Sequence, residues 1–167
     1  MKTHSLIIHA RDALETLTPL NTDCGQLCGG RCCQASDAGE GMLLFPTEEC
    51  LYRNSPWAHV FPSPIPGVKM VTCDGVCPRV ERPLACRIFP LTPYMKNGRL
   101  RIRMDERSKF MCPLYSSGVE GLDGRFMDAV RNAMYALMFD DGQRAFLKTV
   151  TDEIDDFVRL TRLSGRD

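Results

Sequence analysis

The sequence lacks net charge, long apolar runs and most of the groups that enzymes use as bases. Its 167 residues include 21 Lys and Arg and 21 Asp and Glu, so no overall charge favours nucleic acid or an anionic membrane. No run approaches the roughly 20 apolar residues that a membrane-spanning helix needs. Only three histidines are available, which gives thiol-nucleophile chemistry little support. These shortages argue against nucleic-acid and membrane partners, and they assign no reaction.

Two recognisable signals are also missing. The apolar stretch Leu6–Ile8 soon reaches Arg11 and Asp12, and it is shorter than the roughly 7–15 apolar residues of a signal peptide. We therefore expect a cytoplasmic protein. The glycines lie among cysteines and no Lys-Ser/Thr follows them, so the sequence does not predict a phosphate-binding loop.

Cysteine, in contrast, is abundant, with nine residues. An odd count, the absence of an export signal and the adjacent pair Cys32-Cys33 argue against a disulfide framework. Cytosolic thiols are kept reduced, and clustered reduced thiols commonly serve as metal ligands. The cysteines are therefore the candidate functional centre.

The spacing of the cysteines indicates metal binding. Ligands separated by two to four residues can close around one ion, because a turn brings their sulfur atoms together, and glycines inside the turn permit positive φ. Cys24-x3-Cys28 and Cys73-x3-Cys77 have this form. The predicted ligands come from two distant parts of the chain: Cys24, Cys28, Cys32, Cys33, Cys73, Cys77, Cys86 and Cys112.

The identity and number of the metals stay open at this point. Neighbouring side chains such as Cys32 and Cys33 point to opposite sides, so either they bind different metals or one of them packs instead. Eight thiols fit two zinc sites, or one four-iron cluster with thiols to spare. A zinc- or iron-chelating protein and an iron–sulfur redox protein or oxidoreductase are the alternatives. Cys50 has no partner at ligand spacing, and we expect a buried free thiol there.

Arginines accompany the predicted ligands. Four thiolates around a dication leave two negative charges, which neighbouring cations can offset. Arg31, Arg79, Arg82 and Arg87 lie close to the cysteines in sequence, and we expect Arg87, next to Cys86, to support the site. A second set, Arg99, Arg101 and Arg103, forms either a solvated strand face or a surface for an anionic partner.

The cysteine pattern resembles a known family. The vicinal pair Cys32-Cys33, the central pair Cys73 and Cys77, the segment Arg82-Pro-Leu-Ala-Cys-Arg-Ile-Phe-Pro90 and the late Cys112-Pro113 resemble the YkgJ family of CxxCxxCC cysteine-cluster proteins. That resemblance covers about residues 20–115 and implies a zinc- or iron-chelating domain. It has two departures, because the leading spacings are x3 and x3, and the central pair is tighter than usual.

Hydrophobic periodicity predicts a small α+β protein with one domain over 1–167. A cysteine-rich, metal-stapled region over about 20–115 is expected to pack against an N-terminal helix and an antiparallel helical hairpin over about 119–162. Asn97-Gly98 predicts a type I′ hairpin turn, and Pro83 suits the first turn of a short helix that carries Cys86. The expected elements are helices over 5–17, 47–54, 119–139 and from the Asp140-Asp141-Gly142 break to about 160, a proline-rich loop over 56–66, a strand over 68–72 and a hairpin over 94–104.

Overall fold

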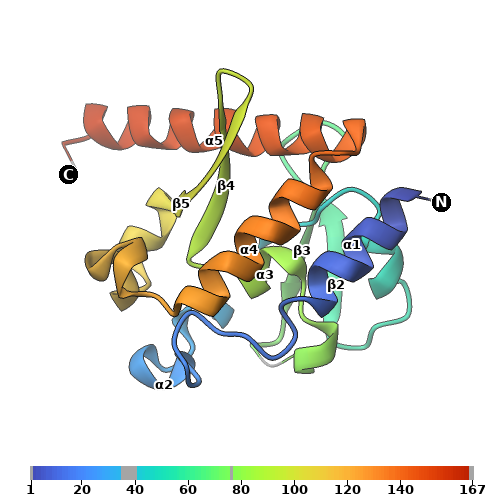
Figure 1. The fold of residues 1–167 in the computed structure, drawn as a ribbon, viewed down its shortest axis with the longest axis horizontal. Coiled ribbons are helices and arrows are strands. Elements are labelled where there is room, and N and C mark those ends of the chain that lie inside the picture. Colours follow the sequence, from blue (N-terminus) through green and yellow to red (C-terminus); the bar gives the residue numbers. More distant parts are fainter. Residues whose placement is uncertain (1, 35–40, 76, 166–167) are drawn as a thin grey trace.

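The computed structural model describes residues 2–34, 41–75 and 77–165, and it confirms a small α+β fold. Figure 1 shows helices around two small antiparallel sheets. Within the described residues the α-helices are α1 Lys2–Asp12, α2 Gly25–Cys28, α3 Leu84–Ile88, α4 Gly124–Leu137 and α5 Asp141–Leu163. The strands are β1 Met42–Leu43, β2 Ala58–Pro62, β3 Lys69–Cys73, β4 Leu91–Lys96 and β5 Arg99–Met104. Short 3₁₀ helices connect them at Arg31–Cys33, Glu48–Tyr52, Arg79–Glu81, Glu106–Phe110, Pro113–Ser117 and Val119–Gly121.

The main hydrophobic core lies between α1, α3, α4, α5 and the β4–β5 hairpin. Asp123 caps the N-terminus of α4, and its side chain accepts hydrogen bonds from the first-turn amides of Arg125 and Phe126. The stripe that includes Phe126, Val130 and Met134 is fully buried, as its helical spacing predicts. Helices α1 and α4 pack side by side (Figure 1), so the first and last thirds of the chain share this core.

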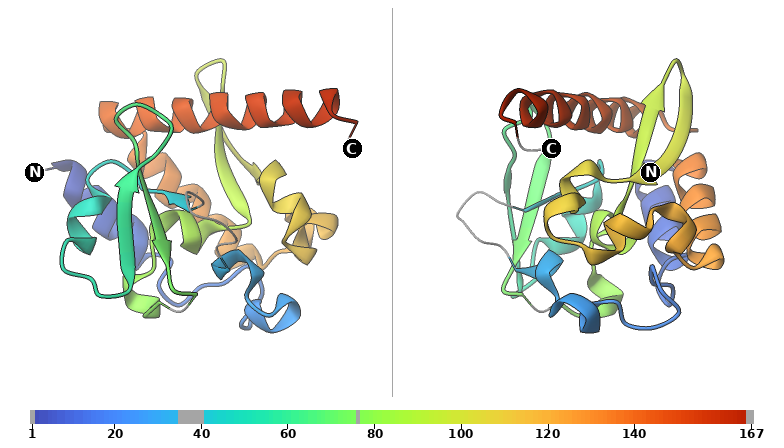
Figure 2. Two further views of the ribbon diagram at one scale, coloured as in Figure 1. Left: turned by 180° about the vertical axis from the view of Figure 1, so that it is seen from behind. Right: turned by 90° about the vertical axis from the view of Figure 1, so that its left-hand side faces the viewer.

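The β4–β5 hairpin has the predicted type I′ turn. Asn97 and Gly98 both have positive φ, at 52° and 71°, and Leu91 pairs with Met104 at the far end of the ladder. Helix α5 crosses the hairpin (Figures 1 and 2) and holds it through Thr151, whose hydroxyl accepts a 2.7 Å hydrogen bond from the Met95 amide. The two C-terminal helices therefore diverge from their turn: α4 packs on α1 and α5 packs on β4.

A second, smaller hydrophobic cluster lies at the three-stranded sheet, whose order is β1-β3-β2. The strand predicted over 68–72 is confirmed as β3. The proline-rich loop predicted over 56–66 is wrong in part, because Ala58–Pro62 forms β2 at the sheet edge. An edge strand tolerates Pro62 at its end, and burial of Trp57 and Ala58 orders the segment.

Two predicted helices differ in detail. Helix α1 begins at Lys2 and ends at Asp12, not Leu17; the amides of Leu14 and Glu15 bind the carbonyls three residues before them. Arg79 then donates to the carbonyl oxygens of Glu15 and Leu17 at 2.8 and 2.9 Å. The segment predicted as a helix over 47–54 is a 3₁₀ helix at Glu48–Tyr52, and Thr47 precedes it with a φ of 73° and no side-chain cap. Among the helices described here, none is both long and apolar enough to cross a bilayer.

Candidate metal centre

A glycine-rich turn carries the first four cysteines. Cys28 ends α2, and Gly29 and Gly30 follow with φ of 64° and 68°, in the left-handed region that favours glycine. The Gly30 amide donates to the Gly25 carbonyl at 3.0 Å and thereby closes the turn. The chain then reverses into the 3₁₀ helix Arg31–Cys33. The turn thus brings Cys24 and Cys28 near the vicinal pair, as the Cys-x3-Cys spacing predicts.

The other four predicted ligands come from three separate elements. Cys73 is the last residue of β3, and Gly75, with a φ of 85°, turns the chain toward Cys77. Cys86 lies in the middle of α3, the predicted short helix, and Pro83 is the N-cap residue just before it rather than part of its first turn. Cys112 immediately precedes the 3₁₀ helix Pro113–Ser117. All nine cysteines are free thiols in this structure.

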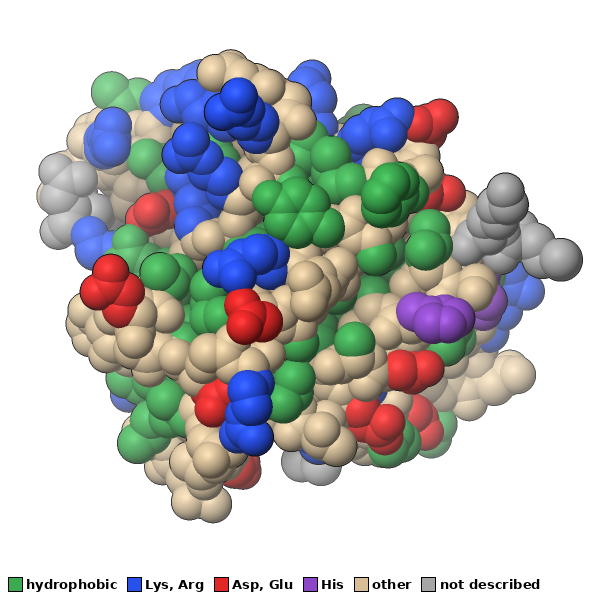
Figure 3. Space-filling model, in the orientation of Figure 1, with side chains coloured by type: hydrophobic (Ala, Val, Ile, Leu, Met, Phe, Trp, Pro, Cys, Tyr) green, Lys and Arg blue, Asp and Glu red, His purple; other side chains and the backbone are tan. Residues whose placement is uncertain are grey.

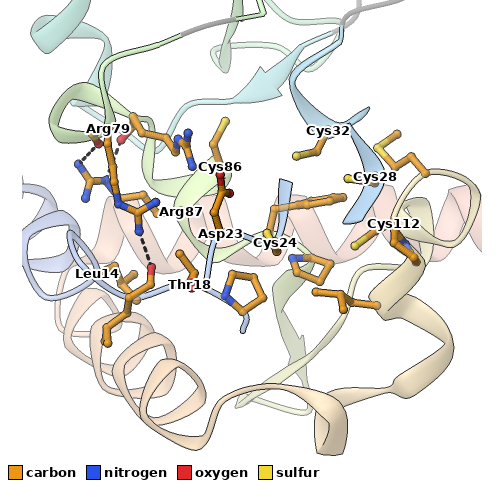
Figure 4. Close-up of a pocket in the computed structure, with 18 residues that line it drawn as sticks. Leu14, Thr18, Asp23, Cys24, Cys28, Cys32, Arg79, Cys86, Arg87 and Cys112 are labelled. Atoms are coloured by element: carbon orange, nitrogen blue, oxygen red, sulfur yellow. Dashed lines mark hydrogen bonds between the residues drawn. The ribbon is translucent and has the colours of Figure 1, made fainter. Parts of the chain in front are cut away.

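These elements converge on two adjoining cavities. The smaller cavity, about 60 Å³, has Cys24, Cys28 and Cys112 in its wall, and none of these three lines the larger one. The larger cavity, about 410 Å³, has Cys33, Cys73 and Cys77 in its wall, and none of these lines the smaller one. Cys32 and Cys86 line both. Figure 4 shows Cys28, Cys32 and Cys112 on one side of the smaller cavity and Cys86 on the other, near Arg79 and Arg87.

The thiols influence one another's pKa within two sets, one around the smaller cavity and one around the larger. Burial, Asp23 and the thiols Cys112 and Cys28 raise the pKa of Cys24. Burial raises the pKa of Cys73, and Cys77 and Cys33 raise it further. Burial raises the pKa of Cys86 well above its ordinary value, with further contributions from Cys33, Cys77 and Cys73. The neighbours of Cys86 are therefore the thiols of the larger cavity.

The vicinal pair joins the two sets. The Cys32 and Cys33 sulfur atoms lie 4.0 Å apart. Their hydrogen bond lowers the pKa of Cys33 to about 6, with a further lowering by Arg82, and raises that of Cys32. Cys24 and Cys28 also raise the pKa of Cys32. The thiols that raise the pKa of Cys32 therefore include Cys24 and Cys28 of the smaller cavity, whereas Cys33 raises the pKa of Cys73 and Cys86, which line the larger cavity.

The donor set fits a thiophilic metal in kind and in number, but the sulfur atoms are not at bonding distances. Over 2–34, 41–75 and 77–165, no three His, Cys, Asp or Glu side chains are arranged closely enough to hold an ion. Four-thiolate sites are a common arrangement for zinc and for iron–sulfur clusters, and eight thiols in two sets supply the ligands for two. Metal binding at these residues thus requires each set of thiols to close inward.

Arg82 is a cation that faces the thiols. Although burial lowers its pKa, a hydrogen bond to Cys77 and the charges of Cys33 and Cys86 raise it overall. Its Nε atom is buried and has no hydrogen-bond partner among the described residues. Arg82 can therefore offset the negative charge of the thiols that line the larger cavity, as the sequence predicts for arginines near the ligands.

Arg87, the arginine expected to support the site directly, has a different role. Its guanidinium donates to the carbonyl oxygens of Arg82 (2.9 Å), Arg11 (3.2 Å), Arg79 (3.0 Å) and Val80 (2.8 Å). Arg79 likewise donates to backbone carbonyls, and Arg31 is exposed at the rim of the larger cavity. The hydrogen bonds of Arg87 and Arg79 therefore go to backbone carbonyls of the segments that frame α3 rather than to the thiols.

Glu48 lies in the segment 47–54 that the sequence predicts as a helix, and the structure buries it. Its side chain is fully buried, and its two oxygens accept hydrogen bonds from the Leu84 amide (2.7 Å) and the Phe45 amide (3.2 Å). Leu84 is the first residue of α3, so Glu48 holds the N-terminus of the helix that carries Cys86. Arg11 Nε lies 3.8 Å from the same carboxylate. Glu-Glu after Thr47 gave no signal of burial.

We expect Glu48 to make stability fall as the pH rises. Burial raises the pKa of Glu48 to about 7 from an ordinary 4.5, against the lowering by Leu84, Arg11 and Phe45. Between these values the folded chain keeps a proton that the unfolded chain has lost, so the stabilisation is complete below about pH 4.5 and is lost as the pH rises through about 7. From about pH 4.5 to about pH 7, the free energy of unfolding of the wild type should fall by up to roughly 3 kcal/mol relative to that of Glu48→Gln, measured by urea unfolding.

The comparison of Glu48→Gln with wild type cancels the pH dependence that the thiols contribute to both proteins. Glu49→Gln is the matched control, because Glu49 is partly exposed and makes no hydrogen bond or ion pair within the described parts of the chain. A stability difference between wild type and Glu48→Gln that stays constant from pH 4.5 to 8 would contradict the argument.

Two further predictions change in the structure. Cys50 is exposed rather than buried, so the expectation that it packs as a small hydrophobe is wrong. It lies on the outer side of the 3₁₀ helix Glu48–Tyr52, where Glu48 instead takes the buried position, and it accepts a weak hydrogen bond from Arg53 at 3.6 Å. Of the predicted arginine row, Arg103 stacks on the Tyr94 ring, with its guanidinium carbon 3.6 Å from the centroid.

Arg99 and Arg101 stay exposed on β5. Figure 3 shows basic side chains gathered in the upper part of this face, where the hairpin lies. The described residues provide no ion pair for either arginine. An anionic partner at this surface stays a prediction.

Comparisons with protein-family models, with curated proteins and with solved structures found no match to this chain. The resemblance to the YkgJ family therefore stays a prediction carried by the motif residues.

Proposed function

We propose that this protein is a metal-binding protein that chelates zinc or iron through clustered cysteine thiolates. One observation carries the proposal: eight of the nine cysteines, from distant segments, line two adjoining cavities, while Cys50 lies outside both. Packing of ordinary structural cysteines would not require this convergence. The residues that would hold metal are Cys24, Cys28, Cys32, Cys33, Cys73, Cys77, Cys86 and Cys112.

The surrounding residues suit such a site. Arg82 supplies a positive charge beside Cys77, and Glu48 and Arg87 fix the backbone around Cys86 through buried hydrogen bonds. A thiolate-bound metal would supply folding energy to the irregular segment around Cys24–Cys33, which packs few apolar side chains of its own. Free thiols in this number require a reducing compartment, so the proposal places the protein in the cytoplasm.

The test is metal analysis with a visible absorption spectrum on protein purified without oxygen. We expect zinc or iron at about one to two equivalents for mononuclear sites, or iron with acid-labile sulfide and a brown colour for an iron–sulfur cluster. Reduced protein that takes up neither zinc nor iron, from growth medium or on addition of the salts, would contradict the proposal. Cys50→Ser is the control, and its metal content should equal that of the wild type.

A further inference from the structure

The eight thiols do not form one undivided cluster. Three cysteines, Cys24, Cys28 and Cys112, line only the cavity of about 60 Å³, and three others, Cys33, Cys73 and Cys77, line only the cavity of about 410 Å³. The two residues common to both walls are assigned by their neighbours. Cys32 lies beside Cys28 and Cys112 on one side of the smaller cavity, whereas Cys86 lies on the other side (Figure 4) and lines the larger cavity with Cys33, Cys73 and Cys77.

The hydrophobic packing divides the thiols in the same way. Cys24 and Cys112 pack against the main core beneath α1, α4 and α5. Cys73 and Cys77 pack against the separate cluster at the three-stranded sheet, which includes Tyr52, Trp57 and Val71. Each set of thiols is therefore anchored on a different part of the fold.

The vicinal pair explains how one turn serves both sets. Cys32 and Cys33 lie 4.0 Å apart at their sulfur atoms. The walls that they line differ, since Cys32 lines the smaller cavity with Cys24 and Cys28, whereas Cys33 lines only the larger one, with Cys73 and Cys77. Adjacent side chains that diverge rarely reach one small ion in good geometry, but they suit two ions on opposite sides of the chain.

We propose that the chain holds two separate four-thiolate metal centres, one formed by Cys24, Cys28, Cys32 and Cys112 and the other by Cys33, Cys73, Cys77 and Cys86. The inference rests on the proposed metal-binding function and adds the division of its ligands. No thiolate is shared, so the two centres bind and lose metal independently. Together they fasten the glycine-rich turn to the main core through Cys112 and to the three-stranded sheet through Cys73 and Cys77.

The first test uses the wild-type protein loaded with cadmium-113 and read by NMR. Two centres without a shared thiolate should give two cadmium signals of equal area, with no coupling between the two cadmium nuclei. A single signal, or two signals with cadmium–cadmium coupling through a bridging sulfur atom, would overturn the division while leaving metal binding intact. Protein that binds no cadmium, zinc or iron would instead remove the proposed function itself.

The second test removes one centre at a time. Cys28→Ser/Cys112→Ser and Cys73→Ser/Cys77→Ser should each retain about half of the wild-type zinc, measured on protein whose circular dichroism shows that it is folded. Cys50→Ser is the matched control and should keep all of it. Loss of all zinc from either folded double variant would contradict two independent centres; where a double variant does not fold, the cadmium signals of the wild type decide.

Discussion

Cys86→Ala is expected to lose the metal bound by its set of thiols and to lower the free energy of unfolding by several kcal/mol. Cys86 lies in the middle of α3, and Glu48 holds the start of this helix, so the backbone should keep its place when the sulfur atom is removed. Structural zinc sites contribute on the order of 10 kcal/mol to folding at neutral pH, and loss of one of four ligands removes much of that contribution. The measurements are metal content and urea unfolding.

Cys50→Ala makes the same chemical change at a cysteine outside both cavities. Its thiol is exposed and its only described side-chain contact is the weak bond from Arg53, so metal content and stability should match the wild type. In Cys86→Ala, loss of packing by the sulfur atom alone would cost roughly 1–2 kcal/mol of stability without loss of metal. Metal content therefore distinguishes a ligand from a residue that only packs. Wild-type metal content in Cys86→Ala would remove Cys86 from the ligand set.

Local signals in the sequence predicted the elements whose conformation short-range chemistry decides. Asn97-Gly98 fixes a type I′ turn because both residues tolerate positive φ, and the stripe through Phe126 and Met134 is buried because helical spacing places it on one face. The Cys-x3-Cys spacings and their glycines also predicted the turns that carry the thiols. The convergence of those segments was predicted from the ligand spacings and from the family resemblance, but the positions that the segments take follow from the rest of the fold.

Long-range contacts decided what the sequence did not predict. Helix α1 ends before its apolar pattern does, and the carbonyls of Glu15 and Leu17 beyond it bind Arg79, which lies more than 60 residues away. Burial of Trp57 turns part of a proline-rich segment into β2. Glu48 is buried because α3 presents an amide to it. The division of the thiols into two sets depends likewise on the positions of two hydrophobic clusters, which no local motif reports.

Arg87→Lys is expected to lower the free energy of unfolding by roughly 3 kcal/mol although it keeps the charge. The guanidinium of Arg87 is nearly buried and donates to four backbone carbonyls, on Arg11 and in the segment 79–82. A lysine ammonium group is a compact donor on a flexible stem and does not reproduce this planar arrangement. The ammonium group can replace about one of the four hydrogen bonds, and each one lost costs about 1 kcal/mol, while the carbonyls of Arg11 and Arg79 keep the amides of Leu14 and Arg82 as donors. Urea unfolding of both proteins measures the loss.

The matched control is Arg101→Lys, because Arg101 is exposed on β5 and the change should leave stability almost unaltered. Arg87→Lys has a second consequence for the metal centre. The segment that it holds includes Arg82, whose guanidinium faces Cys77 and Cys33, so its release should weaken zinc binding in competition with a chromogenic chelator. Unchanged stability in Arg87→Lys would show that the four hydrogen bonds contribute little. Lost stability with unchanged zinc affinity would instead separate this backbone network from the thiols and limit Arg87 to the fold.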